Sequence, residues 1–322
     1  MAEVAATWVH AVRAGLGASL SASSGLNANQ GGFSVPAGQQ VVVTVDTLVC
    51  DVHFTLARGA ASAGHKSLAV NLSDLAAMGA EPRWASLVLS LPGTLPSGWL
   101  EGFGEGLRQL AERTPLEVIA VELQPGPLTI TIQAWGLVPA GAALLRSAAT
   151  PGDLIMVTGT LGDAALALRL GSAAGSEASA AAFLARRLDR PEPRNAFGIA
   201  LRGLAHGAID VSDGLLADLG HILERSGCGA TLQLKQLPIS APARLMADAD
   251  TALDCALRGG DDYELCFTLP AHCETEVRRR AGELGLPVTV IGVIEPEPGL
   301  RAEAPDGSLR TLPVSGWDHF RW

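Results

Sequence analysis

The sequence is poor in aromatic and basic side chains. Only 4% of its 322 residues are Phe, Trp or Tyr, and it has a single tyrosine. Proteins that bind single-stranded nucleic acids stack the bases on aromatic rings, so this scarcity argues against that class. The 23 Lys and Arg residues are outnumbered by 33 Asp and Glu residues, and the formal net charge is −10. Because contacts with duplex phosphates need clustered Lys and Arg, we expect no nucleic-acid partner.

Long apolar runs and paired cysteines are also missing. No apolar stretch approaches the ~20 residues of a membrane-spanning helix. The first residues, "MAEVAATWVHAVRAG", lack the basic start and compact apolar stretch of a secretory signal. The five cysteines form no CxxC pair and no zinc spacing, and their odd number fits poorly with a full disulfide framework. We therefore expect a cytoplasmic protein with reduced thiols and no membrane partner.

The apolar residues that are present fall into segments with helical or strand periodicity. They make up 48% of the sequence, enough for a substantial core, and a chain of 322 residues favours two domains. The β-branched run 39–49 predicts a strand, and 65–82 predicts a helix whose buried stripe contains Leu68, Leu72, Leu75 and Met78. Further strands are expected at 84–92, 116–123 and 127–138, and a helix at 99–113.

Turn residues around "RSAATPGD" interrupt this pattern. We therefore expect a domain boundary near residue 148, which gives domains 1–147 and 148–322. In the second domain, "LIMVTGTLGDAALALRL" predicts a strand, a glycine turn and a helix. The stretch 171–182 is biased toward small residues and is interpreted as a surface linker. The segment "RGGDDYELCFTLP" predicts a tight turn with two aspartates at its lip and a departing strand.

The segment "IDVSDGLLADLGHILERSGCG" combines aspartates with an apolar stripe. Its periodicity predicts a helix that ends at Gly227, with an inner face made by Leu215, Leu219, Ile222 and Leu223. Ser212 and Asp213 stand where residues that cap a helix are found. Asp218, five residues beyond Asp213, is predicted on the solvated side of the helix.

Several oxygen donors lie at strand ends and helix starts. Strand alternation sends Thr44 and Asp46 to the same face, and Asp74 projects roughly opposite the leucine stripe of its helix. Together with Asp210 and Asp213 they are the ligand types that Mg²⁺ prefers and shares with substrate phosphates. Each has an ordinary structural alternative, such as helix capping for Asp213 or a strand-end turn for Asp46. Taken one at a time, these positions favour the structural alternatives.

From about residue 41 to the C-terminus the chain resembles the bacterial thiamine-monophosphate kinases, a family of the aminoimidazole-ribonucleotide synthetase superfamily. Six motifs in the same order carry the resemblance: "TVDTLVCDVHF", "KSLAVNLSDLAAMGAEP", "LLRSAATPGDLIMVTGTLGD", "IDVSDGLLADLGHI", "GGDDYELCFT" and "GWDHF". It implies an α+β fold of two domains. The N-terminal domain would contain a mixed β-sheet, bind metal and nucleotide, and pair the chain into a homodimer. The C-terminal domain would be an α/β sandwich.

The resemblance also implies an activity: transfer of the γ-phosphoryl group of ATP to thiamine monophosphate, which gives thiamine diphosphate. The metal assists a direct transfer, so no catalytic side chain is implied. Carried over by motif position, the residues that would bind Mg²⁺ are Thr44, Asp46, Asp74, Glu122, Asp210 and Asp213. Arg146 and Ser212 would contact ATP, and His53, Asp261 and Trp317 would hold thiamine monophosphate. The structural alternatives are a hydrogen-bonded His53, an Arg146 salt bridge at the domain boundary and a Trp317 that anchors the tail.

The sequence departs from the family at metal-binding positions. The family's Gly-x-Gly-Asp-Asp stretch aligns with "GLGAS", which has Ala18 and Ser19 at the two aspartate positions, and its Gly-Gly-Asp-Thr stretch aligns with "AVEL", which has Glu122 for the aspartate. Val45 also replaces a threonine. The extra methylene of Glu122 moves a carboxylate by about an ångström, which in a preorganised site can cost ~10²-fold in rate. Reduced kinase activity is therefore one expectation. A catalytically weak or inactive paralogue that binds nucleotide or thiamine phosphate, and a superfamily enzyme that activates another acceptor with ATP, are the alternatives.

Overall fold

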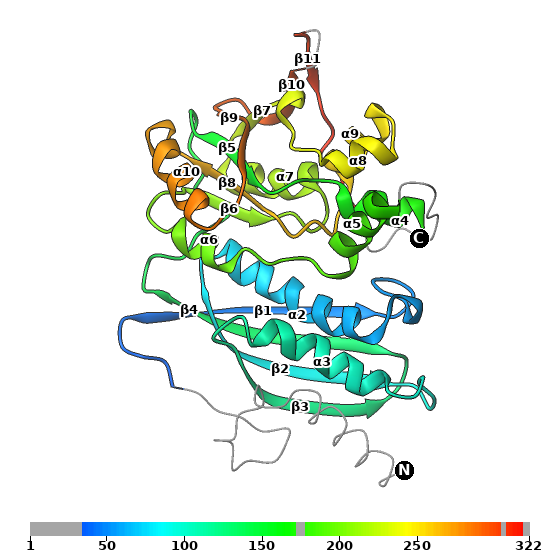
Figure 1. Cartoon of the computed structure of the whole chain (residues 1–322). Helices are drawn as coiled ribbons and strands as arrows, with labels where there is room; N and C mark the ends of the chain where they lie inside the picture. Colours follow the sequence, from blue (N-terminus) through cyan, green and yellow to red (C-terminus); the bar gives the residue numbers. More distant parts are fainter. Residues whose placement is uncertain (1–33, 172–177, 304–306, 318–322) are drawn as a thin grey trace. The chain divides into compact units, whose positions relative to one another are not determined.

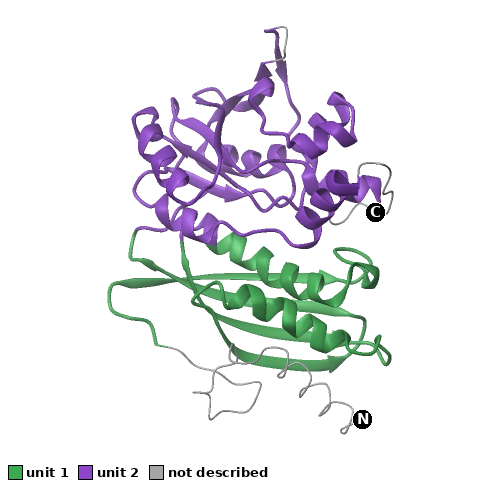
Figure 2. Ribbon diagram, viewed as in Figure 1, with its two compact units in different colours: residues 1–75, 80–141 green, residues 76–79, 142–322 purple. Residues whose placement is uncertain are grey.

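The structure is a computed structural model that describes residues 34–171, 178–303 and 307–317 (Figure 1). The chain divides into two compact units (Figure 2). Unit 1 comprises Met1–Leu75 and Ala80–Gly141, and unit 2 comprises Ala76–Gly79 and Ala142–Trp322. The predicted boundary near residue 148 lies slightly beyond the division between Gly141 and Ala142. Both units combine helices with a mixed sheet, which is the α+β fold that the sequence predicts.

In its described residues, unit 1 is one four-stranded sheet with the two long helices α2 and α3 on one face (Figure 1). The strand order is β1-β4-β2-β3, and only β2 and β3 run parallel. The strands are β1 Gln39–Val49, β2 Glu81–Leu91, β3 Glu117–Pro125 and β4 Thr129–Pro139. The helices are the 3-10 turn η2 Leu56–Arg58, α2 Ala60–Ala77 and α3 Trp99–Ala111.

The core of unit 1 follows the predicted apolar patterns. Leu68, Leu72 and Leu75 of α2 are fully buried, as predicted, whereas Met78 lies beyond the end of the helix and is only half-buried. The helices α2 and α3 cross where glycine permits close approach. A Cβ atom on Gly106 of α3 would lie 1.9 Å from the carbonyl oxygen of Ala61 of α2, so no larger residue fits at this crossing.

The described strands of unit 2 form a seven-stranded sheet in the order β11-β10-β7-β9-β5-β8-β6. Its strands are β5 Leu154–Thr158, β6 Gly207–Asp210, β7 Gly229–Gln233, β8 Leu265–Leu269, β9 Val288–Glu295, β10 Gly299–Glu303 and β11 Leu309–Thr311. Its α-helices are α4 Asp163–Leu170, α5 Ala178–Asp189, α6 Asn195–Ala200, α7 Leu215–Ser226, α8 Ala241–Met246, α9 Ala249–Arg258 and α10 Glu274–Glu283. The 3-10 turns are η3 Leu234–Gln236 and η4 Ala271–Cys273.

The interior strand β5 of this sheet packs against helices on both faces. Ile155 and Val157 of β5 belong to a buried cluster with the apolar face of α7. Met156, which alternation sends to the other face, is buried with side chains of α6 and α10. Unit 2 is therefore the α/β sandwich that the sequence predicts. The four predicted inner-face residues of α7 are all buried.

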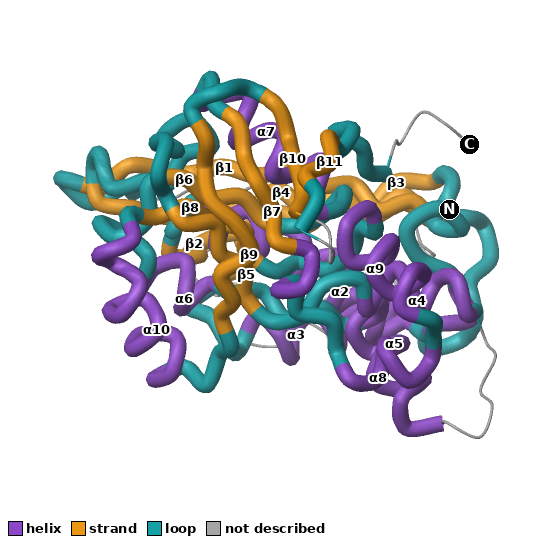
Figure 3. Tube along the Cα trace, turned by 90° about the horizontal axis from the view of Figure 1, so that it is seen from above, coloured by secondary structure: helices purple, strands orange, loops and turns teal. Residues whose placement is uncertain are grey.

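The helices α4, α5, α8 and α9 form a separate group with its own buried cluster, and Figure 3 shows them side by side. This corrects the interpretation of 171–182 as a linker, because α5 begins at Ala178 and buries Ala180, Leu184 and Leu188. Alanine has the highest helix propensity, and these apolar residues recur at helical spacing, so the small-residue bias concealed a packed helix. Among the helices of the described residues, none has the length and apolar character to cross a membrane.

Candidate functional site

In unit 1, two of the predicted metal-binding residues are in contact. The hydroxyl of Thr44 on β1 donates a hydrogen bond to the carboxylate of Asp74 on α2. Asp46 lies two residues farther along β1, so its side chain is on the same face of the sheet as that of Thr44, the face that α2 and α3 cover. This unit 1 acidic group offers only oxygen donors, the ligand type that suits a hard cation.

The strand register does not bring Glu122 to this face. Asp46 is opposite Ile132 of β4. Ile132 is opposite Leu87 of β2, and Leu87 is opposite Val121 of β3. Residues paired across neighbouring strands share a face, and consecutive residues alternate. Glu122 therefore lies on the opposite face from Asp46, where its side chain is exposed.

His53 lies in the turn after β1, and the backbone fixes its ring. The N–H of Val49 donates to Nδ1 of His53 at 3.0 Å, and Lys66 Nζ donates to the His53 carbonyl at 3.4 Å. Because Nδ1 accepts a hydrogen bond, a neutral ring carries its proton on Nε2. Asp51, in the same turn, has a φ of 64°, a left-handed conformation that is uncommon outside glycine.

In unit 2, the residues Val211–Gly214 form a turn that leads from β6 into α7, and we name it the SDG turn. One carboxylate oxygen of Asp218 accepts hydrogen bonds from the N–H groups of Ser212, Asp213 and Gly214, at 3.0, 3.0 and 3.1 Å. Asp218 is only 2% exposed, so its predicted position on the solvated side of the helix is wrong. Side chains in the first turn of a helix point back toward the N-terminus, which brings this carboxylate over the turn that precedes α7.

This arrangement also replaces the predicted helix cap. The residue at the cap position of α7 is Gly214, and no side chain caps the helix there. Burial raises the pKa of the Asp218 carboxyl to about 7, and the charge of Asp213 adds to the rise, while the three N–H donors oppose it. The Asp218 carboxylate, rather than a side chain at the cap position, therefore holds the turn that carries Ser212 and Asp213.

The carbonyl groups of the SDG turn bind the segments that carry the predicted substrate residues. The carbonyl of Ser212 accepts the N–H of Asp261, and the carbonyl of Asp213 accepts the N–H of Trp317, both at 2.8 Å. The carbonyl of Val211 accepts the N–H of Tyr263 at 2.9 Å. The structure thus brings together four predicted site positions of unit 2: Ser212, Asp213, Asp261 and Trp317.

Close backbone packing and unusual dihedral angles accompany these bonds. A Cβ atom on Gly260 would lie 2.2 Å from the Ser212 carbonyl oxygen. Asp261 and Tyr263 have φ values of 68° and 51°, and the Tyr263 hydroxyl donates to the Asp261 carboxylate at 3.0 Å. Non-glycine residues in this region cluster at functional sites, where the surroundings hold them in place. Trp317 is 52% exposed.

The two remaining predicted residues of unit 2 differ in exposure. Asp210 ends β6, where it pairs with Leu265, and it is 2% exposed. Arg146 is exposed, and its carbonyl accepts a hydrogen bond from the Ser226 hydroxyl at 3.2 Å. The aligned positions Ala18 and Ser19 lie outside the described residues. Within the described ranges, no three His, Cys, Asp or Glu side chains are grouped closely enough to hold a metal ion.

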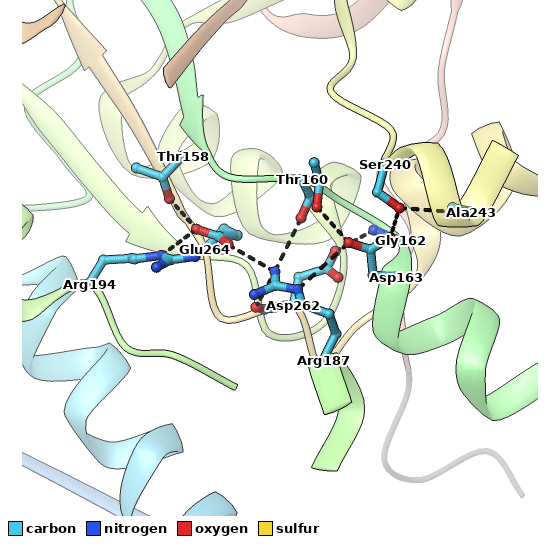
Figure 4. Close-up of polar contacts among 10 residues, drawn as sticks. All are labelled: Thr158, Thr160, Gly162, Asp163, Arg187, Arg194, Ser240, Ala243, Asp262 and Glu264. Carbon is cyan, nitrogen blue, oxygen red and sulfur yellow. Dashed lines mark hydrogen bonds and ion pairs between the residues drawn. The ribbon is translucent and has the colours of Figure 1, made fainter. Parts of the chain in front are cut away.

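A buried ionic network behind the turn that carries Asp261 was not predicted (Figure 4). Glu264 is 1% exposed and accepts hydrogen bonds from the Thr158 hydroxyl at 2.6 Å, from Arg187 at 2.8 Å and from Arg194 Nε at 2.7 Å. In Figure 4, Arg187 lies between Glu264 and Asp163, whose carboxylate is 3.6 Å from Arg187 Nε. The sequence signal was present in "DDYELCFTLP", where charged residues adjoin a largely apolar strand and so need buried partners.

Comparisons with known proteins find related proteins that match most of the chain. Residues 27–138 match the family model "AIR synthase related protein, N-terminal domain", and residues 150–304 match the corresponding C-terminal domain. The thiamine-monophosphate kinase of Escherichia coli K12 is 43% identical over 290 residues, which is 89% of each chain. That of Haemophilus influenzae is 42% identical, again over 89% of each chain.

Solved structures give the same relationship. The crystal structure of thiamine-monophosphate kinase from Stenotrophomonas maltophilia superposes with a TM-score of 0.80 at 47% identity, and the match covers 84% of this chain and 87% of that one. AaThiL complexed with AMPPCP and TMP superposes with a TM-score of 0.78 at 28% identity, and the match covers 92% and 93% of the two chains.

Proposed function

The chain belongs to the thiamine-monophosphate kinase family of the AIR synthase related proteins, and we infer that it phosphorylates thiamine monophosphate to thiamine diphosphate with ATP. The observation that carries this conclusion is the match to curated kinases of this activity over 89% of both chains. The related AaThiL was solved with AMPPCP, an ATP analogue, and with TMP. The geometry supports the same conclusion, because the SDG turn is bonded directly to the segments of Asp261 and Trp317. The alternatives of an inactive paralogue or another acceptor have no such support.

The reaction joins two anionic phosphates, so charge neutralisation and alignment are its main requirements. An oxygen of the acceptor phosphate is already ionised, so no general base is needed. Mg²⁺, when bound, supplies positive charge between the phosphates of the two substrates. The chain itself contributes oxygen ligands, orienting contacts and a rigid backbone around them.

For Mg²⁺ binding, the proposed ligands of unit 1 are Thr44, Asp46 and Asp74. The oxygens of Thr44 and Asp74 are adjacent, as the hydrogen bond between them indicates, and Asp46 lies on the same face of β1 as Thr44. In unit 2 the proposed ligands are Asp210 and Asp213. Because Mg²⁺ is usually held by one or two carboxylates with substrate phosphates and water, no compact all-protein cage is required. Glu122 is left out of this set, since it lies on the opposite face of the sheet from Asp46.

The proposed substrate contacts divide between the two substrates. Ser212 and Arg146 would contact ATP, and His53, Asp261 and Trp317 would hold thiamine monophosphate. The thiazolium ring of this substrate is a cation, and a half-exposed tryptophan together with a carboxylate offers it cation–π and ionic attraction. The substitutions at Ala18 and Ser19 remove two carboxylates, which supports a kinase with lower affinity for Mg²⁺ than its relatives.

We also propose a cytoplasmic homodimer. All five cysteines lie in the described ranges and none is bridged, which is the state expected in a reducing compartment. The strand β1 lies at one edge of its sheet and pairs, among the described strands, with β4. Val43 and Val45 on this strand are 51% and 60% exposed. A long sheet edge with exposed apolar side chains is a typical protein interaction surface.

Coupled measurement of ADP release tests the activity. With ATP, Mg²⁺ and thiamine monophosphate, we expect turnover that depends on thiamine monophosphate and stops when EDTA removes the metal. Substrate binding without ADP release would instead support the inactive paralogue. Turnover that occurs only with a different acceptor would support a repurposed superfamily enzyme.

A further inference from the structure

We propose that Asp218 is a positioning residue of the kinase reaction, which fixes the backbone of the SDG turn so that Ser212 and Asp213 face their ligands in a set direction. The proposal rests on the proposed function, since it concerns the same site. Asp218 itself is assigned no contact with either substrate. It acts through the peptide groups that it binds.

The geometry on the N–H side of the turn is unusually complete. Three consecutive N–H groups, those of Ser212, Asp213 and Gly214, converge on a single carboxylate oxygen of Asp218 within 3.1 Å. Such a concave row of amides forms an anion-binding nest. Gly214 continues the turn at a φ of 115°, which favours glycine. The chain's own carboxylate fills the nest, so the amides of the turn are hydrogen-bonded within the protein. The side chains of Ser212 and Asp213 are then the groups of the turn that face ligands.

The carbonyl groups of the same turn are also hydrogen-bonded within the protein. The carbonyls of Val211, Ser212 and Asp213 accept hydrogen bonds from Tyr263, Asp261 and Trp317. The peptide planes of the turn are therefore held between the Asp218 carboxylate and the two segments that carry the proposed thiamine-phosphate contacts. If the turn shifts, Asp261 and Trp317 shift with it. Asp218 thus sets the relative position of the nucleotide-side and acceptor-side residues of unit 2.

The expected effect on rate follows from this coupling. Removal of the carboxylate leaves three N–H groups without their acceptor and frees the turn to relax. A misplacement of about 1 Å in a catalytic arrangement can cost ~10²-fold in rate. We therefore expect Asp218→Ala to lower kcat/KM by about 100-fold for both substrates and to raise the Mg²⁺ concentration needed for half-maximal rate. Asp218→Asn, which keeps one carbonyl oxygen, should restore part of this loss.

The control is Asp248→Ala in the same unit. Asp248 caps α9 by accepting the N–H of Thr251 at 2.8 Å, so it forms the same type of bond away from the SDG turn. This variant should lower the melting temperature without changing kcat/KM per folded molecule. If Asp218 were only structural, Asp218→Ala would behave in the same way, and a kcat/KM within twofold of wild type for the folded variant would overturn the proposal.

Hydrogen exchange of backbone amides tests the positioning role of Asp218 independently of the proposed kinase activity. It is measured on Asp218→Asn, so it remains informative if Asp218→Ala folds poorly. In Asp218→Asn, the amides of Ser212, Asp213, Asp261 and Trp317 should exchange faster, whereas Asp248→Ala should leave them unchanged. Unchanged exchange in Asp218→Asn would overturn the proposed coupling even if the enzyme is active. A wild-type protein that does not phosphorylate thiamine monophosphate would refute the proposed function, and the exchange rates would then test the positioning alone.

Discussion

Asp262 carries a carboxyl oxygen that the fold leaves without a hydrogen bond. Its Oδ2 accepts the N–H of Gly162 at 2.7 Å, whereas its Oδ1 is buried and has no partner among the described residues. Burial raises the pKa of this carboxyl well above its usual range, and the nearby Arg187 only partly opposes the rise. The network of Figure 4 also contains Asp163 and Glu264, so three carboxyl groups share two arginines, which favours the neutral form of Asp262.

This environment predicts a specific pH dependence for Asp262→Asn. The pKa is higher in the folded than in the unfolded chain, so the wild-type carboxyl stabilises the fold at low pH and loses that contribution as the pH rises from about 4 through its folded value. We therefore expect the unfolding free energy of wild type to fall relative to that of Asp262→Asn between pH 5 and pH 8. Urea titrations at several pH values measure this difference.

Asp248→Asn provides the control for that titration. The N–H of Thr251 lowers the pKa of Asp248, so its contribution is complete above about pH 4 and is lost only as the pH falls. The difference between wild type and Asp248→Asn should consequently stay constant from pH 5 to pH 8. A similarly constant difference for Asp262→Asn would show that burial does not perturb this carboxyl.

At the scale of elements, the crossing of α2 and α3 depends on glycine. Gly106→Ala would place a methyl group 1.9 Å from the backbone oxygen of Ala61, and the helices would have to separate. We expect a loss of about 1–3 kcal/mol in unfolding free energy. Gly282 of α10 is the matched control, because a Cβ atom there meets nothing within 4 Å. Gly282→Ala should be neutral or stabilising by up to about 1 kcal/mol, through its effect on helix propensity. Equal effects of both substitutions, measured by urea unfolding, would contradict the close crossing.

The elements themselves were largely predictable, because apolar periodicity is a local property of the sequence. The strand at β1 and the buried leucines of α2 follow directly from it. Asp218 was misplaced because helical periodicity predicts only the direction of a side chain around the axis, and not the amides of a preceding turn that fold back over it. The Glu264 network was missed for a related reason, since its arginines come from segments distant in sequence.

The residues of the candidate site were predictable from the sequence, but their positions in the fold were predictable only in part. Motif order supplied all the proposed residues, and the structure joins Ser212 and Asp213 to Asp261 and Trp317 through backbone bonds. The position of Glu122 required the strand register. Motif alignment places it at the family's aspartate position, but it cannot tell which face of the sheet that position occupies in this chain.

For the whole molecule, the exposed surface of β1 bears on assembly. Among the described strands β1 forms a sheet edge with exposed valines, and Asp46 is the one charged residue in its sequence. Native proteins usually protect such edges with charges, prolines or a covering partner. We therefore propose that pairing with a second copy of the chain covers the exposed valines Val43 and Val45.

Val43→Lys tests the proposed homodimer. A lysine on the strand would bring like charges together in a two-fold interface and would need its ammonium desolvated there, so we expect dissociation to a monomer at micromolar concentration. Light scattering coupled to size-exclusion chromatography measures the mass directly. Leu168 of α4 is 60% exposed and belongs to unit 2, so Leu168→Lys introduces the same charge at an exposed apolar position that is not part of β1. The wild type and Leu168→Lys should both have the mass of two chains. A monomeric wild type, or a Val43→Lys variant that remains dimeric while folded, would exclude the β1 edge as the interface.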